Sequence, residues 1–172
     1  IRSTGFSAKV AEALGAAPVA MPQGETYEAL QKGVVDGTFT PIETLKGWKQ
    51  AEVVKYTTDC PDIGYTTAMF VVMNLDKWNA LPDDLKKIFD EVSSEWIAKH
   101  GEAWDSLDKD GKEYALSLNN EIIALSPAEN LRWVDAVAPV IDGFIKSTTE
   151  KGLPGEKAIA EIRRLLGEYG KN

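Results

Sequence analysis

The sequence predicts an α/β fold built on a largely parallel sheet, and three observations support this prediction. Short apolar segments alternate with amphipathic helical segments through the first third of the chain. This β-α-β-α order favours parallel strands, because parallel neighbours must be joined by crossovers that are usually helices. Residues 68–73 are nearly all apolar, which is typical of a strand covered on both faces. With 172 residues, 44% of them hydrophobic, the chain can bury a core.

The first third is expected to hold short strands that are each followed by a helix. Apolar residues spaced three or four apart indicate the helices, and Gly15 and Gly33 are typical helix stops. The strands are expected at residues 1–4, 17–21 and 38–40, and the helices at residues 7–14 and 25–32 and directly after Pro41.

The second half is expected to be mostly helical. Apolar residues recur at steps of three and four from Leu85 to Leu107, which predicts one long amphipathic helix over residues 82–118. A proline and two acids suit its first turn, and a break is expected, if anywhere, near Gly111. Further strands are expected at residues 53–58 and 121–125. The capping-box pattern Ser126–Glu129 predicts a helix that begins at Pro127, and a last helix is expected over residues 154–169.

Composition excludes several functional classes. The single cysteine, Cys60, permits no disulfide framework, and the single histidine, His100, cannot supply a histidine cluster for zinc. A net charge of −8 argues against nucleic acid or an anionic membrane as a partner. The chain has no apolar run of about 18 residues that could span a membrane. It begins at Ile1 without a signal segment, so we expect a processed or truncated chain.

Catalytic motifs are not evident. Cys60 lacks a nearby base and is better interpreted as a small structural hydrophobe. His100 lies on the apolar stripe of the long helix and is better interpreted as a packed or rim imidazole than as a catalytic one. Residues 106–117 resemble a calcium loop only faintly, because serine occupies both its first and last ligand positions. An enzyme that uses Asp36 or Glu43 as a base remains an alternative, although nothing in the sequence requires it.

Two segments carry side chains suited to a small polar ligand. Arg2, beside Ser3 and Thr4, could present its planar guanidinium to a carboxylate, although composition alone favours a surface arginine near a terminus. Phe39 and Thr40 would offer an aromatic wall and a hydroxyl at a helix start. The alternative is that these threonines merely cap the next helix.

A series of motifs then resembles one transporter family. In order, the chain has Arg2-Ser3-Thr4-Gly5, an ETYEALQ segment at residues 25–31, a GVVDG segment at residues 33–37 and a VMNLDKW segment at residues 72–78. This series resembles the DctP-type solute-binding proteins of tripartite ATP-independent periplasmic (TRAP) transporters. The resemblance runs over essentially the whole chain, but it covers only the later half of such a protein.

The resemblance implies a periplasmic-binding-protein-like (type II-like) α/β lobe with a parallel-rich sheet. Family members have two such lobes, with the ligand in the cleft between them and a long helix across the back. The chain would then supply the C-terminal lobe and parts of an incomplete N-terminal lobe. Residues 1–64 would begin the C-terminal lobe, and residues 65–81 would be a hinge strand that crosses to the mostly missing N-terminal lobe. Residues 82–118 would form the long spine helix. Residues 119–172 would return to the C-terminal lobe and form the C-terminal helices.

The same resemblance implies a set of ligand-binding residues. Arg2 matches the arginine that binds the substrate carboxylate in this family, and Gln23 matches a position that lines the pocket. Thr40 falls where many members, which read Asp-Gly-Gln-Glu-Asn-Pro, carry an asparagine, whereas this chain reads Asp-Gly-Thr-Phe-Thr-Pro. Phe39 therefore suggests a more apolar or aromatic ligand. Tyr65 and Thr67 are expected near the lining of the returning strand.

The expected function is that of an extracytoplasmic, periplasmic solute-binding subunit. It would capture a small organic acid between two lobes and deliver it to the TRAP membrane permease subunits. No catalysis, cofactor or bound metal is expected, nor contact with nucleic acid, and the chain would not be embedded in a membrane. The rival is a non-transport interaction domain that docks a partner through its helical C-terminal half.

Overall fold

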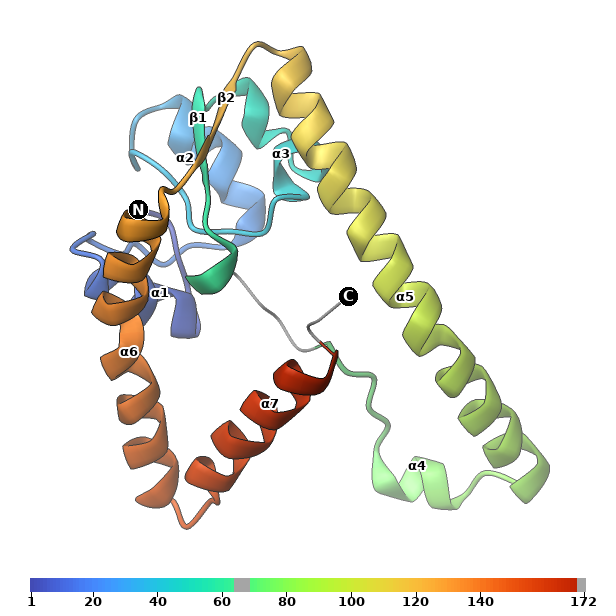
Figure 1. The fold of residues 1–172 in the computed structure, drawn as a ribbon. Helices are drawn as coiled ribbons and strands as arrows, with labels where there is room; N and C mark the ends of the chain where they lie inside the picture. Colours follow the sequence, from blue (N-terminus) through green and yellow to red (C-terminus); the bar gives the residue numbers. More distant parts are fainter. Residues whose placement is uncertain (64–68, 170–172) are drawn as a thin grey trace.

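The computed structural model describes residues 1–63 and 69–169. Figure 1 shows a lobe formed by the first third of the chain, from which a long helix leads away before the chain returns. The helices are α1 (Gly5–Ala13), α2 (Thr26–Gln31), α3 (Thr44–Gly47), α4 (Leu75–Asn79), α5 (Asp83–Ser117), α6 (Pro127–Thr149) and α7 (Gly155–Tyr169); the short 3₁₀ turns are η1 (Gln23–Glu25), η2 (Gln50–Glu52) and η3 (Pro61–Ile63); the strands are β1 (Tyr56–Asp59) and β2 (Glu121–Ala124).

The predicted α/β fold with parallel strands is confirmed. Arg2 forms parallel bridges to Val19 on one side and to Thr38 on the other. β1 pairs with β2 in parallel, with Tyr56 opposite Glu121. The strands expected at residues 1–4, 17–21 and 38–40 are reduced to these single bridges, while the helices between them form close to their expected positions.

One predicted strand is wrong within the described residues. The apolar run at residues 68–73 was expected to be a sheet interior, but residues 69–74 have no strand, and the helix α4 follows directly. A strand exists only where its backbone pairs with a neighbour. No described segment pairs with residues 69–74, so the apolar composition alone does not produce a strand there.

The long helix is confirmed, and it is continuous where a break was considered. α5 runs through Gly111 without a break. The missing side chain of this glycine lets the helix lie close to the backbone of Ile42 and Glu43, next to α3. A Cβ atom at residue 111 would overlap the carbonyl oxygen of Ile42 and would lie only 3.2 Å from the Cα of Glu43. One turn further on, Ala115 is fully buried against Leu45. The contact between α3 and α5 is therefore the core that positions the lobe.

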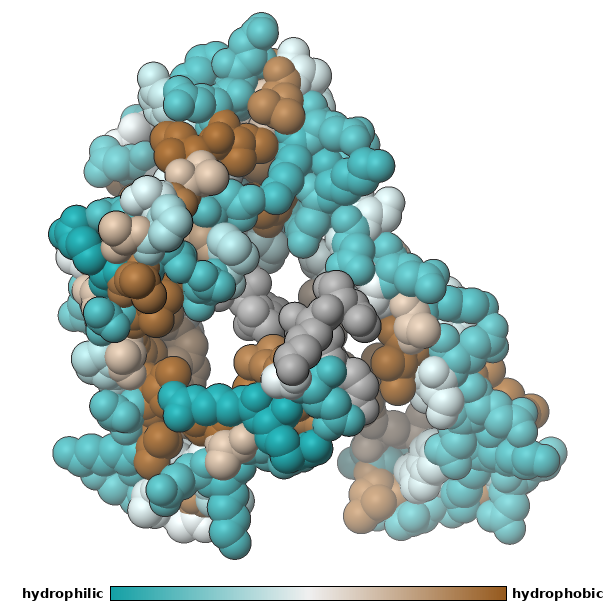
Figure 2. Space-filling view, in the orientation of Figure 1, coloured by the Kyte–Doolittle hydropathy of each residue, from teal (hydrophilic) through white to brown (hydrophobic). Residues whose placement is uncertain are grey.

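The first turns of α5 carry an apolar face that the described residues leave largely uncovered. Figure 2 shows apolar surface along the lower part of α5, near α4. The amphipathic pattern that predicted the helix is thus real, but its stripe is packed only in small part, where the Phe89 ring meets the Trp78 ring of α4 edge to face. The exposed members of the stripe are Leu85, Ile88, Phe89, Val92, Trp96, Ile97 and, further along, Leu107.

The predicted capping pattern before α6 is half formed. The Ser126 hydroxyl accepts a hydrogen bond from the backbone N–H of Glu129 at 3.2 Å. The Glu129 carboxylate does not reach back to close the box, because it binds the side chains of Arg132 and Trp133. α6 then packs on α1, where the Phe6 and Phe144 rings meet edge to face, and α7 packs back on α6.

Candidate ligand-binding site

Arg2 lies at the centre of the bridged parallel segments. Only 6% of its surface is exposed, so the interpretation as a surface arginine is wrong. Its backbone is fixed by the bridges to Val19 and Thr38. Its guanidinium donates from Nε and Nη2 to the carbonyl oxygen of Met21, at 3.2 and 3.1 Å. The strand pairing therefore fixes where this side chain begins, and the Met21 carbonyl fixes its orientation.

The charge of Arg2 has no opposite charge beside it in the described part of the chain. Its hydrogen bonds there go to a neutral carbonyl, and it forms no ion pair with any described carboxylate. A buried charge is costly unless it is paired and hydrogen-bonded. Nη1 has no acceptor among these residues, so one edge of the guanidinium remains available to a carboxylate.

Several polar atoms of the same segments are buried without a hydrogen-bond partner among the described residues. They include Gln23 Nε2 and Thr40 Oγ1, two of the atoms expected at the ligand site. Because buried polar groups normally have partners, each of these unpaired atoms is a position where a ligand or water would complete the bonding. The Thr40 hydroxyl makes no helix-capping bond, so the capping alternative is wrong for this residue.

Two further polar residues belong to this set but were not predicted as site residues. Ser3 follows Arg2 directly, and its fully buried hydroxyl has no partner among the described residues. Thr38, which bridges to Arg2, likewise has an unpaired buried hydroxyl. In the sequence only the adjacency of Ser3 to Arg2 was a signal, because the bridge of Thr38 and the burial of both hydroxyls are seen only in the structure.

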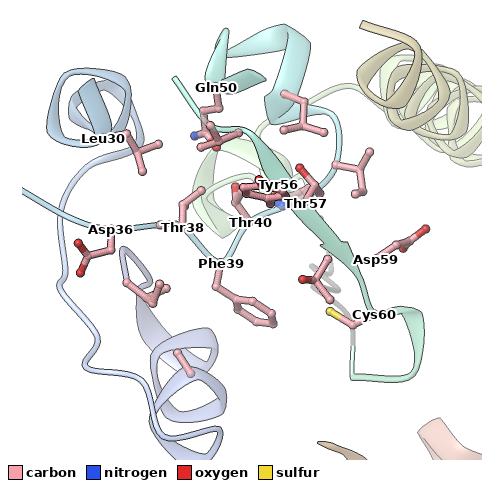
Figure 3. Close-up of a pocket in the computed structure, with 18 of the residues that line it drawn as sticks. Leu30, Asp36, Thr38, Phe39, Thr40, Gln50, Tyr56, Thr57, Asp59 and Cys60 are labelled. Carbon is pink, nitrogen blue, oxygen red and sulfur yellow. The ribbon is translucent and has the colours of Figure 1, made fainter. Parts of the chain in front are cut away.

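Phe39 is held directly beside the Arg2 backbone. Its N–H donates to the Arg2 carbonyl oxygen at 2.8 Å. Figure 3 shows its ring projecting from the segment into the space that separates it from Cys60. An aromatic side chain therefore lies on the segment next to the buried arginine.

The expected residues do not all line one cavity. A cavity of about 840 Å³ is lined by Phe39 and Thr40, but neither Arg2 nor Gln23 lines it. Tyr65 and Thr67 lie outside the described residues. Arg2 therefore lies on a backbone segment next to the one that carries Phe39 and Thr40, but these three residues do not line a single pocket.

The groups of the alternative enzyme are not assembled into a site. Burial raises the pKa of the Glu43 carboxyl above its ordinary value, and the Asp108 carboxylate raises it further. The same Asp108 accepts a hydrogen bond from the Glu43 backbone N–H at 2.9 Å, which assigns Glu43 to the contact between α3 and α5. Asp36 is exposed. Within residues 1–63 and 69–169, no three His, Cys, Asp or Glu side chains are grouped to hold a metal.

Cys60 and His100 also lack the surroundings of reactive groups. Burial raises the pKa of the Cys60 thiol, and the neighbouring Asp59 adds to the shift, so the reactive thiolate form is disfavoured. His100 is exposed on α5 and accepts a hydrogen bond at Nε2 from the Trp104 indole at 2.7 Å. Cys60 is only half-buried, and the exposed His100 does not fit the interpretation as a packed imidazole.

The raised pKa of Glu43 predicts how the stability of the protein changes with pH. Because this pKa is higher in the folded chain than the ordinary value of 4.5, the folded state holds the proton more tightly than the unfolded state. The contribution of Glu43 to stability is therefore present at low pH and is lost as the pH rises through the two pKa values. Glu43→Gln should raise the free energy of unfolding, measured with urea, at about pH 7, and the gain should vanish near pH 3.

The control for this prediction is Glu12→Gln, which changes an exposed glutamate on α1. Its stability should follow the parent at both pH values. If Glu43→Gln destabilises the protein at neutral pH, or if its effect does not depend on pH, the proposed cost of the buried carboxylate is contradicted.

Comparison with known proteins shows which family the chain matches. Residues 1–148 match the family DctP, bacterial extracellular solute-binding protein, family 7. Over 171 residues the chain is 32% identical to the C4-dicarboxylate-binding periplasmic protein DctP of Rhodobacter capsulatus. The matched region covers 94% of this chain and 48% of that protein. The chain thus spans about half the length of this relative.

Solved structures agree with the sequence match. A marine metagenome TRAP solute-binding protein specific for aromatic acid ligands, in complex with metahydroxyphenylacetate, has a TM-score of 0.84 and 30% identity, covering 99% of this chain and 55% of that one. A TRAP periplasmic solute-binding protein from Desulfovibrio salexigens has a TM-score of 0.80 and 34% identity, covering 99% of this chain and 54% of that one. The chain therefore belongs to the DctP family of TRAP transporter solute-binding proteins.

Proposed function

We propose that this chain is the ligand-binding C-terminal lobe, with the spine helix, of a periplasmic solute-binding protein that delivers an organic acid to TRAP permease subunits. The protein would bind its ligand without catalysing a reaction. Membership of the family and the names of the relatives support this role. Among the described residues, no helix is both long and apolar enough to cross a membrane.

The observation that carries the proposal is the buried charge of Arg2. A guanidinium with 6% exposure and no carboxylate partner among the described residues is incomplete on its own. A ligand carboxylate would supply the opposite charge, and its two oxygens match the planar guanidinium. Gln23 and Thr40 would donate to further oxygen atoms of the ligand, since their buried polar atoms lack partners.

The uncovered face of α5 fits the same proposal. Its apolar stripe would pack against an N-terminal lobe supplied by the remaining half of the protein. Helices with one apolar face are normally buried along that face. In this arrangement α5 remains fixed to the C-terminal lobe through Gly111, Ala115 and the Lys112–Asp59 ion pair at 2.7 Å. Lobe closure over the ligand would then move the N-terminal lobe against α5.

Phe39 supports a proposal for the ligand class. An aromatic ring on the segment that pairs with Arg2 favours a ligand that joins a carboxylate to an apolar ring. One solved relative is specific for aromatic acids, whereas the Rhodobacter relative is named for C4-dicarboxylates. We expect benzoate-like acids to be bound more tightly than succinate.

Calorimetric titration of the full-length protein tests this expectation. Benzoate should bind, and benzamide, which has the same ring without the charge, should bind at least about 30-fold more weakly because it leaves Arg2 unpaired. Phe39→Asn should weaken benzoate binding about 3- to 10-fold, the loss of one aromatic contact.

The control titration uses succinate, which has no aromatic ring and so makes no ring contact with Phe39. Its affinity should be unchanged or improved in Phe39→Asn. Equal binding of benzoate and benzamide would contradict a carboxylate site, whereas equal losses for benzoate and succinate would contradict only the aromatic preference.

A further inference from the structure

One glutamate of this lobe binds two tyrosines at once. Glu52 is the last residue of η2, and its side chain is exposed. The Tyr27 hydroxyl of α2 donates to Oε2 of Glu52 at 3.1 Å, and the Tyr114 hydroxyl of α5 donates to Oε1 at 2.9 Å. Hydrogen bonds to a charged acceptor are stronger than neutral ones. A single carboxylate therefore joins three elements that are far apart in the sequence.

Both phenols keep their protons in this arrangement. Tyr27 and Tyr114 are half-buried. The hydrogen bond to the Glu52 carboxylate is the largest cause that raises the pKa of each hydroxyl above its ordinary value. The two tyrosines therefore remain neutral donors at neutral pH, where the carboxylate is the acceptor for both.

The Tyr114 side of this contact belongs to the hydrophobic core. Ala115, which follows Tyr114 on α5, is fully buried against Leu45, and Tyr114 packs against the same cluster. Ala51, which precedes Glu52 in η2, is also part of that cluster. The backbone on both sides of the Glu52–Tyr114 bond is thus held by packing, so the Glu52 carboxylate is a fixed point on the core.

The Tyr27 side of the contact leads to the proposed ligand site. Gln23, whose buried Nε2 lacks a partner among the described residues, begins η1, and η1 continues directly into α2. The N–H of Thr26 bonds to the Gln23 carbonyl oxygen and links the two turns. Gln23 and Tyr27 therefore lie about one turn apart on one hydrogen-bonded segment, and a shift of α2 would also shift Gln23.

α2 has few other polar ties. The Thr26 hydroxyl bonds to the Pro22 carbonyl, and Glu28 pairs with Lys32, so both bonds stay within residues 22–32. Among the described residues, the bond from Tyr27 is the one side-chain hydrogen bond that connects α2 with another part of the chain. Its loss would leave the position of α2 to apolar packing alone.

We propose that Tyr27 is a positioning residue for ligand binding: its bond to Glu52 holds the segment from Gln23 to Tyr27 against the core, and so places the Gln23 amide where it donates to the ligand. This role rests on the proposed function, in which Gln23 donates to an oxygen atom of an organic acid. Tyr27 itself would not touch the ligand.

Calorimetric titration of the full-length protein with meta-hydroxybenzoate, an aromatic acid with an oxygen beyond its carboxylate, tests this role in a double-mutant cycle. Tyr27→Phe removes only the hydroxyl and should weaken binding about 3- to 10-fold, part of the energy of a hydrogen bond to a charged group. In a Gln23→Ala background the same change should weaken binding less than about 2-fold, because the amide that Tyr27 places is gone. A merely structural hydroxyl would not show this coupling.

Two further variants complete the test. Tyr114→Phe releases Glu52 from α5 and should weaken binding in the same direction as Tyr27→Phe, again only where Gln23 is present. Glu28→Gln removes a carboxylate of α2 that pairs only with Lys32, and it should leave binding unchanged. Thermal unfolding of each variant separates a loss of affinity from a loss of fold.

Two results would overturn the role of Tyr27. In the first, folded Tyr27→Phe binds meta-hydroxybenzoate as tightly as the parent protein. In the second, its loss of affinity is the same with and without Gln23, so that it does not act through this residue. Failure of the proposed function has a different signature, because Arg2→Gln would then bind the same acid as tightly as the parent.

Discussion

Arg2→Gln should reduce the affinity of the full-length protein for its carboxylate ligand by roughly 30- to 5,000-fold. This range corresponds to the loss of about 2–5 kcal/mol when one partner of a buried, hydrogen-bonded charge pair is removed. The reason is the burial of Arg2 and the lack of a described carboxylate beside it, which leave the ligand as its counter-charge. Isothermal titration calorimetry measures the change directly.

Three controls make this result specific. Arg2→Lys keeps the charge but loses the planar fork, and should recover only part of the affinity. Lys32→Gln removes a cation from an exposed ion pair with Glu28 and should leave binding unchanged. Because Arg2 also bonds to the Met21 carbonyl, thermal unfolding of each variant must show that the fold is retained. Unchanged affinity in a folded Arg2→Gln protein would refute the assigned role.

Gly111→Ala should destabilise the protein by about 1–3 kcal/mol, the usual cost of forcing an extra methyl group into a packed contact. The added Cβ would overlap the Ile42 carbonyl oxygen and lie 3.1 Å from the Ile42 carbonyl carbon. Backbone atoms cannot rotate away as a side chain can. The change should therefore push α5 away from the α3 region and disturb the core around Leu45 and Ala115.

Gly101→Ala in the same helix is the matched control. A Cβ atom there would meet nothing within 4 Å. The substitution should stabilise the chain by about 0.5–1 kcal/mol, since alanine favours a helix over glycine. Urea unfolding of both variants, followed by circular dichroism, gives the comparison. Equal effects at the two positions would show that α5 does not depend on a close approach at Gly111.

The sequence predicted those parts of the fold that depend on local patterns. The alternation of apolar segments and helices in the first third indicated parallel strands, and the bridges of Arg2 confirm this. The spacing from Leu85 to Leu107 indicated α5, whose length the structure reproduces. These features follow from periodicity, which is a property of neighbouring residues and needs no knowledge of the rest of the fold.

Features that depend on a distant partner were not predictable. Glycine within a helix usually weakens it, so only the position of Ile42 reveals why Gly111 lies inside α5 without a break. An apolar run such as residues 69–73 becomes a strand only where another segment pairs with it. The unpaired hydroxyls of Ser3 and Thr38 were likewise invisible, because burial is decided by what packs around them.

The central claim is that Arg2 is completed by a ligand carboxylate. A crystal structure of the full-length protein with bound benzoate tests it most directly. We expect both carboxylate oxygens to lie about 2.7–2.9 Å from guanidinium nitrogens of Arg2, with the ring of the ligand against Phe39. A bound benzoate whose carboxylate pairs with another cation, while Arg2 keeps only the Met21 carbonyl, would contradict the account.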